Sequence, residues 1–359
     1  MLVVGARPNF MKATPLLREL KKYQDRFLPI FLHTGQHYDY EMSKVFFDDL
    51  DLPEPNIYLG VGSGSHAEQT AKIMVELEKV IIEEKPDLVI VFGDVNSTLA
   101  AAVVTAKLLI PLAHVEAGLR SFDRTMPEEI NRIVTDILSE YLFTTEESAN
   151  KNLAKEGIPQ DKIFFVGNIM IDTLVSLKEK AENSAILKEL NLSSKKYAVL
   201  TLHRPSNVDR REKLKEIMDA LSLIAKKIRV LFPAHPRTLK NLKNFGLLEI
   251  YKEKIEFLSP LKYTDFLSLE MYAKFVMTDS GGIQEETTYL GVPCLTLRES
   301  TERPVTVEVG TNLIVGTNGE RIVEEANKIL DGEIKNGNIP EFWDGKTSLR
   351  VTEIFLNNL

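Results

Sequence analysis

Four side chains suited to acid–base chemistry stand where predicted strands end or a predicted helix begins: Asp94, Glu116, Glu128 and His203. Asp94, Glu116 and His203 each follow or close an apolar run typical of a buried strand, and Glu128 lies in Pro127-Glu128-Glu129 at a predicted helix start. Carboxylates and imidazoles are the common proton donors and acceptors of enzymes. Their positions therefore indicate a site for proton transfer.

A structural role is the alternative for each of these residues. Asp94 can cap the helix that follows it, Glu116 can pair with Arg120, and Glu128 can complement a helix dipole without any ligand. His203 can be a hydrogen-bonded structural imidazole. Four such groups at equivalent points of the topology favour function over coincidence.

A motif that suits a phosphate lies in Thr278-Asp279-Ser280-Gly281-Gly282-Ile283-Gln284-Glu285-Glu286. It follows a short apolar run and opens a predicted helix, so backbone N–H groups are left unpaired where the helix begins. These donors favour a phosphate or diphosphate, and the two glycines let the backbone approach it closely. Glu285 or Glu286 can accept hydrogen bonds from ribose hydroxyls. Taken alone, the motif is also explained as a strand–helix turn with acidic residues near the dipole.

The cations that a diphosphate requires stand in similar connections. Arg7 and Lys12 lie in the first strand–helix connection and Arg303 lies in a later one, where the alternative is a solvated surface charge. The glycine cluster Gly60–Ser65 is a weak candidate for a nicotinamide site, because Ser65 stands where the fingerprint needs its third glycine. The six histidines show no zinc spacing. We therefore predict neither a metal nor a cofactor.

Alternating strands and helices must position these residues. Apolar runs predict strands at 2–4, 27–32, 87–92, 111–116, 141–143 and 163–166, and again at 198–202, 230–232, 275–277 and 294–297. This alternation predicts an α/β protein with two parallel sheets, each covered by helices, joined by the polar segment 178–196. Ligands of such sheets bind beyond the carboxyl ends of the strands, so we expect the site in an inter-domain cleft.

Composition narrows the function classes. A chain of 359 residues is too long for one compact core, so two domains are expected. A net charge of −8 argues against a nucleic-acid partner. A single cysteine, Cys294, excludes an internal disulfide and is expected to be buried in a strand. The sequence shows neither a signal peptide nor a membrane span. These features predict a cytoplasmic protein.

The motifs together resemble the non-hydrolysing UDP-N-acetylglucosamine 2-epimerases. The resemblance rests on Gly5-Ala6-Arg7-Pro8 with Lys12, Gly93-Asp94, His114–Arg120, Pro127–Arg132, Thr278–Glu286 and Thr301-Glu302-Arg303-Pro304, and it extends to Trp343–Thr347. It implies two Rossmann-like domains of the GT-B type and usually a homodimer. The expected domains are residues 1–170 with a returning helix at about 346–359, and residues 171–345 as the UDP-binding domain.

The resemblance also assigns residues. Asp94, Glu116, Glu128 and His203 match the catalytic residues of the family. Those that match its UDP-sugar site are Arg7, Lys12, Ser280, Gly281, Gly282, Glu286 and Arg303, and Phe266 falls where a side chain can lie near uracil. Three positions depart from the usual pattern: Asn9 replaces a frequent Glu, Pro205 replaces a second arginine, and Tyr38-Asp39 differs after Gln36-His37. Some bacterial members bind a second UDP-GlcNAc near those last positions as an activator.

The activity implied is the reversible interconversion of UDP-GlcNAc and UDP-ManNAc without NAD. Because C2 is not next to a carbonyl, elimination of UDP to 2-acetamidoglucal and re-addition is the expected route. It requires carboxylates for the proton, cations for the diphosphate and a closed site. Asp94, Glu116 and Glu128 share the acid–base work, and His203 neutralises or protonates the diphosphate. The alternatives are a GT-B glycosyltransferase that uses a UDP-sugar donor, and a non-catalytic UDP-sugar sensor.

Overall fold

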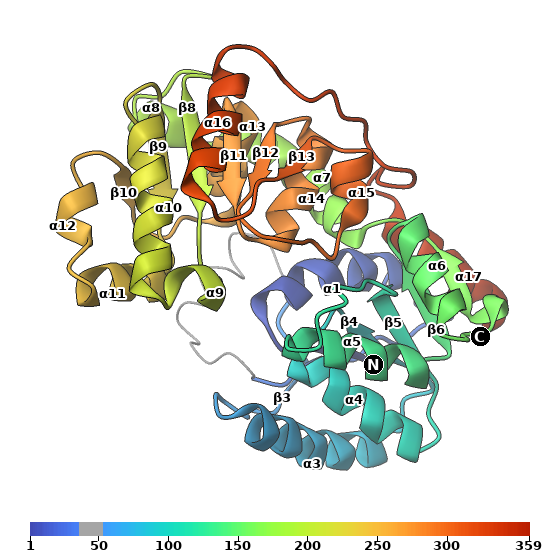
Figure 1. Cartoon of the computed structure of the whole chain (residues 1–359). Coiled ribbons are helices and arrows are strands. Elements are labelled where there is room, and N and C mark those ends of the chain that lie inside the picture. The colour runs from blue at the N-terminus through green and yellow to red at the C-terminus, as the bar shows by residue number, and fades with distance from the viewer. Residues whose placement is uncertain (36–52) are drawn as a thin grey trace. The chain divides into compact units, whose positions relative to one another are not determined.

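The structure is a computed structural model that describes residues 1–35 and 53–359 (Figure 1). Gln36-His37 and Tyr38-Asp39, which the sequence comparison singled out, lie outside the described residues. The chain forms two compact units: Met1–Ser176 with Glu341–Leu359, called here the N-terminal unit, and Leu177–Pro340, called the C-terminal unit.

The N-terminal unit is built on a sheet whose described strands are all parallel, as the alternation predicted. In spatial order the strands are β3 (Ile57–Tyr58), β2 (Phe31–His33), β1 (Leu2–Val4), β4 (Val89–Phe92), β5 (Leu112–Ala117), β6 (Tyr141–Thr144) and β7 (Ile163–Phe165). The connecting helices are α1 (Arg7–Leu20), α3 (His66–Glu84), α4 (Asn96–Lys107), α5 (Pro127–Leu138), α6 (Glu147–Lys155) and η1 (Gln160–Lys162). Helix α7 (Ile169–Glu182) begins in this unit and ends in the C-terminal unit.

The C-terminal unit repeats this design with a second parallel sheet. Its spatial order is β10 (Glu256–Leu258), β9 (Arg229–Pro233), β8 (Tyr197–Thr201), β11 (Phe275–Thr278), β12 (Cys294–Thr296) and β13 (Asn312–Ile314). The helices are α8 (Ile186–Glu189), α9 (Pro205–Val208), α10 (Arg211–Ile224), α11 (Pro236–Asn244), α12 (Leu248–Tyr251), α13 (Tyr263–Tyr272), α14 (Gly281–Leu290), α15 (Pro304–Glu308) and α16 (Gly319–Leu330).

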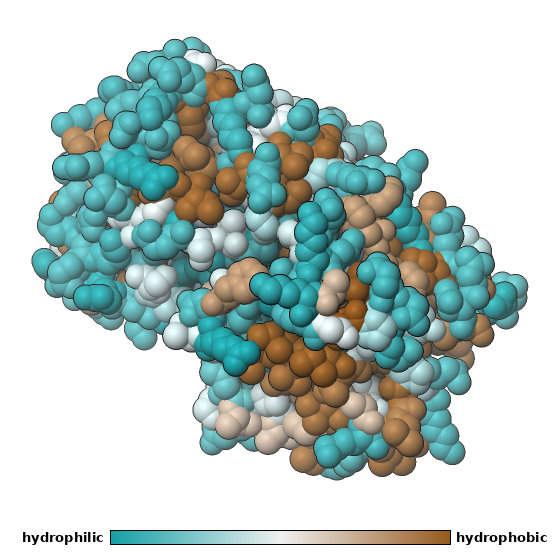
Figure 2. All heavy atoms as spheres, turned by 45° about the vertical axis from the view of Figure 1, so that its right-hand side comes forward, coloured by the Kyte–Doolittle hydropathy of each residue, from teal (hydrophilic) through white to brown (hydrophobic). Residues whose placement is uncertain are grey.

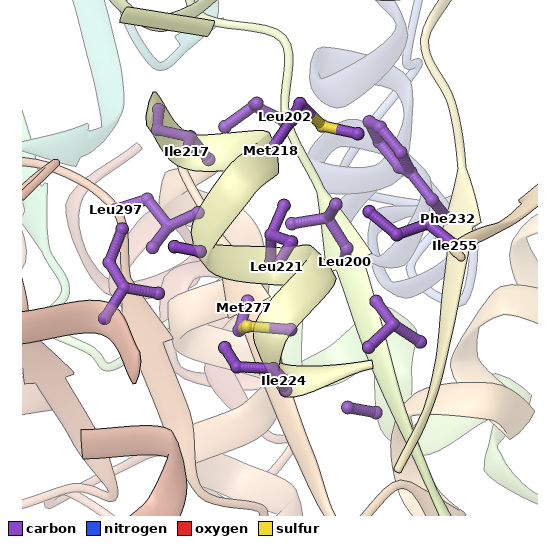
Figure 3. Packing of buried hydrophobic residues seen from close by; sticks show 14 of the residues in the cluster. Leu200, Leu202, Ile217, Met218, Leu221, Ile224, Phe232, Ile255, Met277 and Leu297 are labelled. Atoms are coloured by element: carbon purple, nitrogen blue, oxygen red, sulfur yellow. The ribbon is translucent and has the colours of Figure 1, made fainter. Parts of the chain in front are cut away.

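Strand β8 shows how a central strand serves both faces of its sheet. Leu200 points into a core that α10 covers, where it joins Leu221 of α10 and Phe232 of β9 (Figure 3). Its neighbour Val199 belongs to the opposite core, together with Leu269 of α13. Because successive side chains of a strand point to opposite faces, a strand covered on both sides is a continuous apolar run.

The strand order places the ligand-binding edge in each unit. The direction of winding reverses between β1 and β4, and again between β8 and β11. In doubly wound sheets, ligands bind beyond the carboxyl ends of the strands at this reversal. The turns that follow β4, β8 and β11 carry Asp94, His203 and the Ser280-Gly281-Gly282 motif, and Lys12 lies in α1, the helix that follows β1.

Some predicted strand boundaries were wrong. The run 27–32 predicted one strand, but β2 begins only at Phe31, after Pro29, and the Leu28 side chain is 92% exposed. Strands β3, β10 and β13 were not predicted, because each spans two or three residues with no clear apolar run. Cys294 is buried in β12, as predicted.

The C-terminal helix α17 (Thr347–Asn358) belongs to the N-terminal unit. The Asp172 carboxylate of α7 accepts hydrogen bonds from the backbone N–H of Thr347 at 3.0 Å and of Ser348 at 2.7 Å, so it satisfies donors at the start of α17. The indole N–H of Trp343 donates to the Thr145 carbonyl at 2.9 Å. Among residues 1–35 and 53–359, no helix has the length and apolar character needed to cross a membrane.

Candidate active site

Asn9 joins the two turns at the carboxyl edge of the N-terminal sheet. Its side-chain oxygen accepts hydrogen bonds from the backbone N–H of Gly5 at 3.3 Å and of Ala6 at 3.1 Å. Its amide N–H donates to the Phe92 carbonyl, at the end of β4, over 2.8 Å. Asn9 therefore fastens the turn after β1 to the end of β4, a role for which the amide supplies both an acceptor and a donor.

Glu116 is held in an unusual backbone conformation at the end of β5. Its φ is +76°, which residues other than glycine rarely adopt, and the pairing of β5 with β6 shifts register between Val115 and Ala117. Such strain of a non-glycine residue is typical of functional sites. The bulge directs the buried Glu116 carboxylate to an ion pair with Lys12 of α1.

Gly93 explains how this ion pair fits beside β4. A Cβ on Gly93 would lie 2.9 Å from the Lys12 ammonium nitrogen and 3.0 Å from a Glu116 carboxylate oxygen. The pair therefore packs directly against the backbone of the turn that carries Asp94. The proposed structural partner of Glu116, Arg120, instead pairs with Asp136 and Glu156.

Asp94 is positioned by α5. The Arg132 guanidinium donates to one Asp94 oxygen from Nε at 3.0 Å and from Nη2 at 2.5 Å. Arg132 is fixed in turn by the buried Glu129, 2.8 Å from Nη1. The N-cap of α4 is Val95, so Asp94 is not the cap residue that the structural alternative required.

Glu128 occupies a different environment from the other predicted carboxylates. It lies in the first turn of α5 with its side chain exposed, whereas the adjacent Glu129 is buried. In the described part of the chain, its side chain has no hydrogen bond or ion pair. The structure thus brings Glu116 and Asp94 to neighbouring turns and leaves Glu128 at the surface of the unit.

A buried hydrogen-bond network supports the Gly93 turn and the β5 bulge. His114, fully buried in β5, contacts Asp136 through Nδ1 at 2.6 Å and the Gly93 carbonyl through Nε2 at 2.8 Å. Asp136 also accepts from the Gly118 N–H at 3.1 Å and from Arg120 at 2.8 Å. Burial opposes ionisation of Asp136, but the charges and hydrogen bonds of His114 and Arg120 hold its pKa below the usual value. One carboxylate thereby anchors both the Gly93 turn and the β5 bulge.

The C-terminal unit positions His203 through Asp279. His203 Nδ1 lies 2.8 Å from an oxygen of the buried Asp279 carboxylate, and the backbone N–H groups of His203 and Arg204 donate to the same group. Burial would raise the pKa of Asp279, but the hydrogen bond and charge of His203 together with these N–H groups lower it. The pairing holds Nδ1 and leaves Nε2 of the half-exposed ring for a ligand.

The glycines at the start of α14 have different roles. A Cβ on Gly281 would lie 2.9 Å from both Arg303 Nη1 and Glu302 Oε1, so this glycine makes room for the protein's own side chains. A Cβ on Gly282 would meet nothing within 4 Å, so its backbone borders open space. Ser280 is the N-cap of α14, but its side chain caps no N–H group. The Gly282 end of the helix therefore keeps the features of an anion site.

Three further predicted residues lie on or beside α14: Arg303, Glu286 and Phe266. Arg303 is buried and pairs with Glu285 at 2.6 Å and Glu302 at 2.8 Å. Glu286 is buried and accepts a hydrogen bond from the Tyr263 hydroxyl at 2.8 Å, and Phe266 is partly buried on α13. Arg7 begins α1. Among the described residues, no group of three His, Cys, Asp or Glu side chains is arranged to hold a metal ion.

Comparison with known proteins decides the family. Residues 18–356 match the family described as UDP-N-acetylglucosamine 2-epimerase. The chain belongs to this family. A UDP-N-acetylglucosamine 2-epimerase of Methanocaldococcus jannaschii is 47% identical over 98% of this chain and 97% of the relative. A crystal structure of UDP-GlcNAc 2-epimerase from that organism in complex with UDP-GlcNAc and UDP is 45% identical, covers 99% of both chains and has a TM-score of 0.91.

The epimerase family also contains a relative with another substrate. A UDP-2,3-diacetamido-2,3-dideoxy-D-glucuronate 2-epimerase of Pseudomonas aeruginosa is 38% identical over 98% of this chain and 98% of the relative. The family match and these identities confirm that the chain belongs to the epimerase family, as the motif resemblance predicted. The solved epimerase structures confirm the predicted GT-B type fold of two parallel-sheet units.

Sequence reasoning missed the residues that orient the site. Asp279 lies inside the quoted motif, but nothing in the motif shows that its carboxylate contacts His203. Asp136 and Arg132 lie in α5, where helical spacing was the available signal: Glu129, Arg132 and Asp136 recur at intervals of three and four residues. A polar stripe of this kind on a helix normally predicts a solvated face, and here it is the buried one.

Proposed function

We propose that this protein interconverts UDP-GlcNAc and UDP-ManNAc by inverting C2. The observation that carries the proposal is the pair of carboxylates, Asp94 and Glu116, each held by a cation at the carboxyl edge of β4 and β5 in a chain of the epimerase family. The relative of known structure, crystallised with UDP-GlcNAc and UDP, supports the choice of nucleotide sugar.

Inversion at C2 requires a route that makes this carbon reactive. A carboxylate takes the C2 proton, the C2–H electron pair becomes the C1=C2 double bond of 2-acetamidoglucal, and UDP leaves with the electrons of the C1–O bond. Protonation of C2 from the opposite face and return of UDP to C1 complete the inversion. Atoms and electrons balance without an oxidant, so the reaction needs no nicotinamide.

The two units supply different parts of this chemistry. Asp94 and Glu116, with Glu128, serve as the proton donors and acceptors at C2, and Lys12 holds Glu116 in place. The α14 N-terminus at Gly282 binds the diphosphate, Glu286 accepts hydrogen bonds from the ribose and Phe266 lies near uracil. His203, oriented by Asp279, presents Nε2 to the departing diphosphate. Arg7 and Arg303 add positive charge to the UDP site.

The alternatives differ in what they require. A glycosyltransferase with the same nucleotide site requires an acceptor, and a sensor of UDP-sugars does not require the strained Glu116 beside Asp94. A third alternative is the diacetamido-glucuronate substrate for which the Pseudomonas relative is named. That relative is 38% identical to this chain, whereas the Methanocaldococcus epimerase is 47% identical, so UDP-GlcNAc is the better supported substrate. NMR of the purified protein with UDP-GlcNAc as sole substrate should show UDP-ManNAc appearing. No product without an acceptor would contradict epimerisation.

A homodimer is the assembly that we propose. Helix α5 buries its polar side chains and leaves an apolar stripe outside: Ile130 and Ile137 are 41% and 59% exposed, with the half-buried Ile133 and Val134 on the same face. Figure 2 shows apolar atoms gathered on one face of the N-terminal unit. Such an area is typical of a protein interface, and a second copy of this chain offers the matching stripe.

Light scattering on the purified protein tests the assembly. Ile137→Glu should shift a dimer toward monomer. Leu28→Glu, at an exposed leucine away from α5, is the matched control and should leave the mass unchanged. A wild-type monomer would contradict the proposal.

We place the enzyme in the cytoplasm, because its one cysteine is a buried thiol and its proposed substrate is a nucleotide sugar.

A further inference from the structure

Glu270 is a buried acid for which the proposed reaction has no role. It lies near the end of α13 with none of its surface exposed. Both carboxyl oxygens are buried, and neither receives a hydrogen bond from an N–H or O–H group of a described residue. No cation of the described chain pairs with it. A carboxylate in such a place would be a desolvated charge without compensation.

The titratable groups around Glu270 come from three elements. Glu286 of α14 faces it within hydrogen-bond reach, and Glu286 also accepts from the hydroxyl of Tyr263 of α13. Cys294 of β12 also interacts electrostatically with Glu270, and it is a neutral thiol because burial raises its pKa to about 12. Burial and the neighbouring Glu286 raise the pKa of Glu270 well above its usual value. Two carboxyl groups in contact cannot both ionise in a dry interior, but one proton held between them gives a hydrogen bond and a single charge.

We propose that Glu270 keeps a proton at neutral pH and donates it to Glu286, so that it acts as the positioning residue of the ribose acceptor. Tyr263 and protonated Glu270 then donate to Glu286 and orient its carboxylate for the ribose hydroxyls. This inference rests on the proposed UDP site, in which Glu286 binds the ribose. It adds that tight binding of the ribose depends on Glu270, a neutral glutamic acid that does not contact the ligand.

Two substitutions separate a shared proton from simple packing. Glu270→Gln keeps a neutral donor of nearly the same shape, and it should bind UDP within about threefold of wild type. Glu270→Met keeps the volume without the donor, and it should raise the UDP dissociation constant about 10- to 100-fold, the loss expected for a hydrogen bond to a charged group. The matched control is Tyr197→Phe, which removes the 2.8 Å hydrogen bond to the Leu269 carbonyl on the same helix and should leave UDP affinity unchanged.

A ligand without ribose hydroxyls supplies a readout that packing alone would not change. Calorimetric titration of 2′,3′-dideoxy-UDP should give nearly equal affinities for wild type and Glu270→Met. Equal UDP affinities of wild type, Glu270→Gln and Glu270→Met would overturn the positioning role. A loss of UDP affinity in Glu270→Gln as large as in Glu270→Met would overturn the shared proton.

Infrared spectroscopy tests the proton without any ligand. At neutral pH the difference spectrum of wild type minus Glu270→Gln should contain the C=O stretch of a protonated carboxyl group. An ionised carboxylate band in its place would overturn the inference even where UDP binds. Failure of the wild-type protein to bind UDP would instead refute the proposed function and the ribose role that rests on it. The infrared band would still show whether Glu270 is protonated.

Discussion

Gly282→Val tests the diphosphate site at a position where the protein itself should tolerate the change. A Cβ there meets no protein atom within 4 Å, and valine has a slightly better helix propensity than glycine. We therefore expect the free energy of unfolding to change by less than about 1 kcal/mol. The new side chain instead occupies the space through which a phosphate reaches the first N–H groups of α14.

The expected loss of affinity follows from the hydrogen bonds blocked. A bond from a backbone N–H to a charged phosphate contributes about 1.5–3 kcal/mol. Blocking one or two of them should raise the UDP dissociation constant about 10- to 10⁴-fold, since each 1.4 kcal/mol is about tenfold. Isothermal titration calorimetry with UDP measures this constant, and circular dichroism with thermal unfolding verifies the fold.

Two further glycines make the comparison sharper. Gly319→Val changes the first residue of α16, where a Cβ meets only ordinary contacts of 3.4 Å or more, and it should leave UDP affinity unchanged. Gly281→Ala places a methyl group 2.9 Å from Arg303 and Glu302, so it should lower stability as well as affinity. A folded Gly282→Val protein that binds UDP as tightly as wild type would refute the assignment of this helix start.

Three further predictions concern the carboxylates. Asp94→Asn or Glu116→Gln should slow epimerisation about 10²- to 10⁴-fold with little change in UDP affinity, as measured by turnover assays and calorimetry; an undiminished rate would remove that residue from the mechanism. Asp136→Asn should lower the free energy of unfolding by about 3 kcal/mol in urea titrations, because it removes the buried carboxylate charge that contacts Arg120 and His114 and leaves Arg120 with Glu156 alone; an unchanged midpoint would argue against the network. The pKa of Asp279 is lower in the folded protein than its ordinary value of 3.8. The ionised carboxylate therefore stabilises the fold fully at pH values above 3.8, and this stabilisation is lost as the pH falls through the lowered pKa. Urea midpoints between about pH 7 and about pH 3 should therefore fall more steeply for wild type than for Asp279→Asn, and parallel curves would contradict the assigned shift.

The sequence predicted the architecture because the strands are buried on both faces. Runs such as 87–92 contain no polar residue beyond their first position, and they predict a parallel sheet before any contact is known. Short edge strands such as β3 escaped prediction, since two residues paired on one side leave no pattern.

The candidate site was predicted less completely than the fold. Motifs named Glu116, but neither its positive φ nor its pairing with Lys12 can be deduced from residue types. Helix α5 misleads pattern analysis because its buried face is polar and its exposed face is apolar. The Glu270–Glu286 pair joins two helices that a strand separates in the sequence, and only the fold brings them together.

Hydrogen exchange at C2 tests the proposed reaction most directly. In D₂O, with no NAD added, the enzyme should place deuterium at C2 of UDP-ManNAc and of recovered UDP-GlcNAc, because the proton removed in the elimination is replaced from solvent. Mass spectrometry and proton NMR of both nucleotide sugars measure the label. Epimerisation with the original C2 hydrogen fully retained would contradict the elimination route.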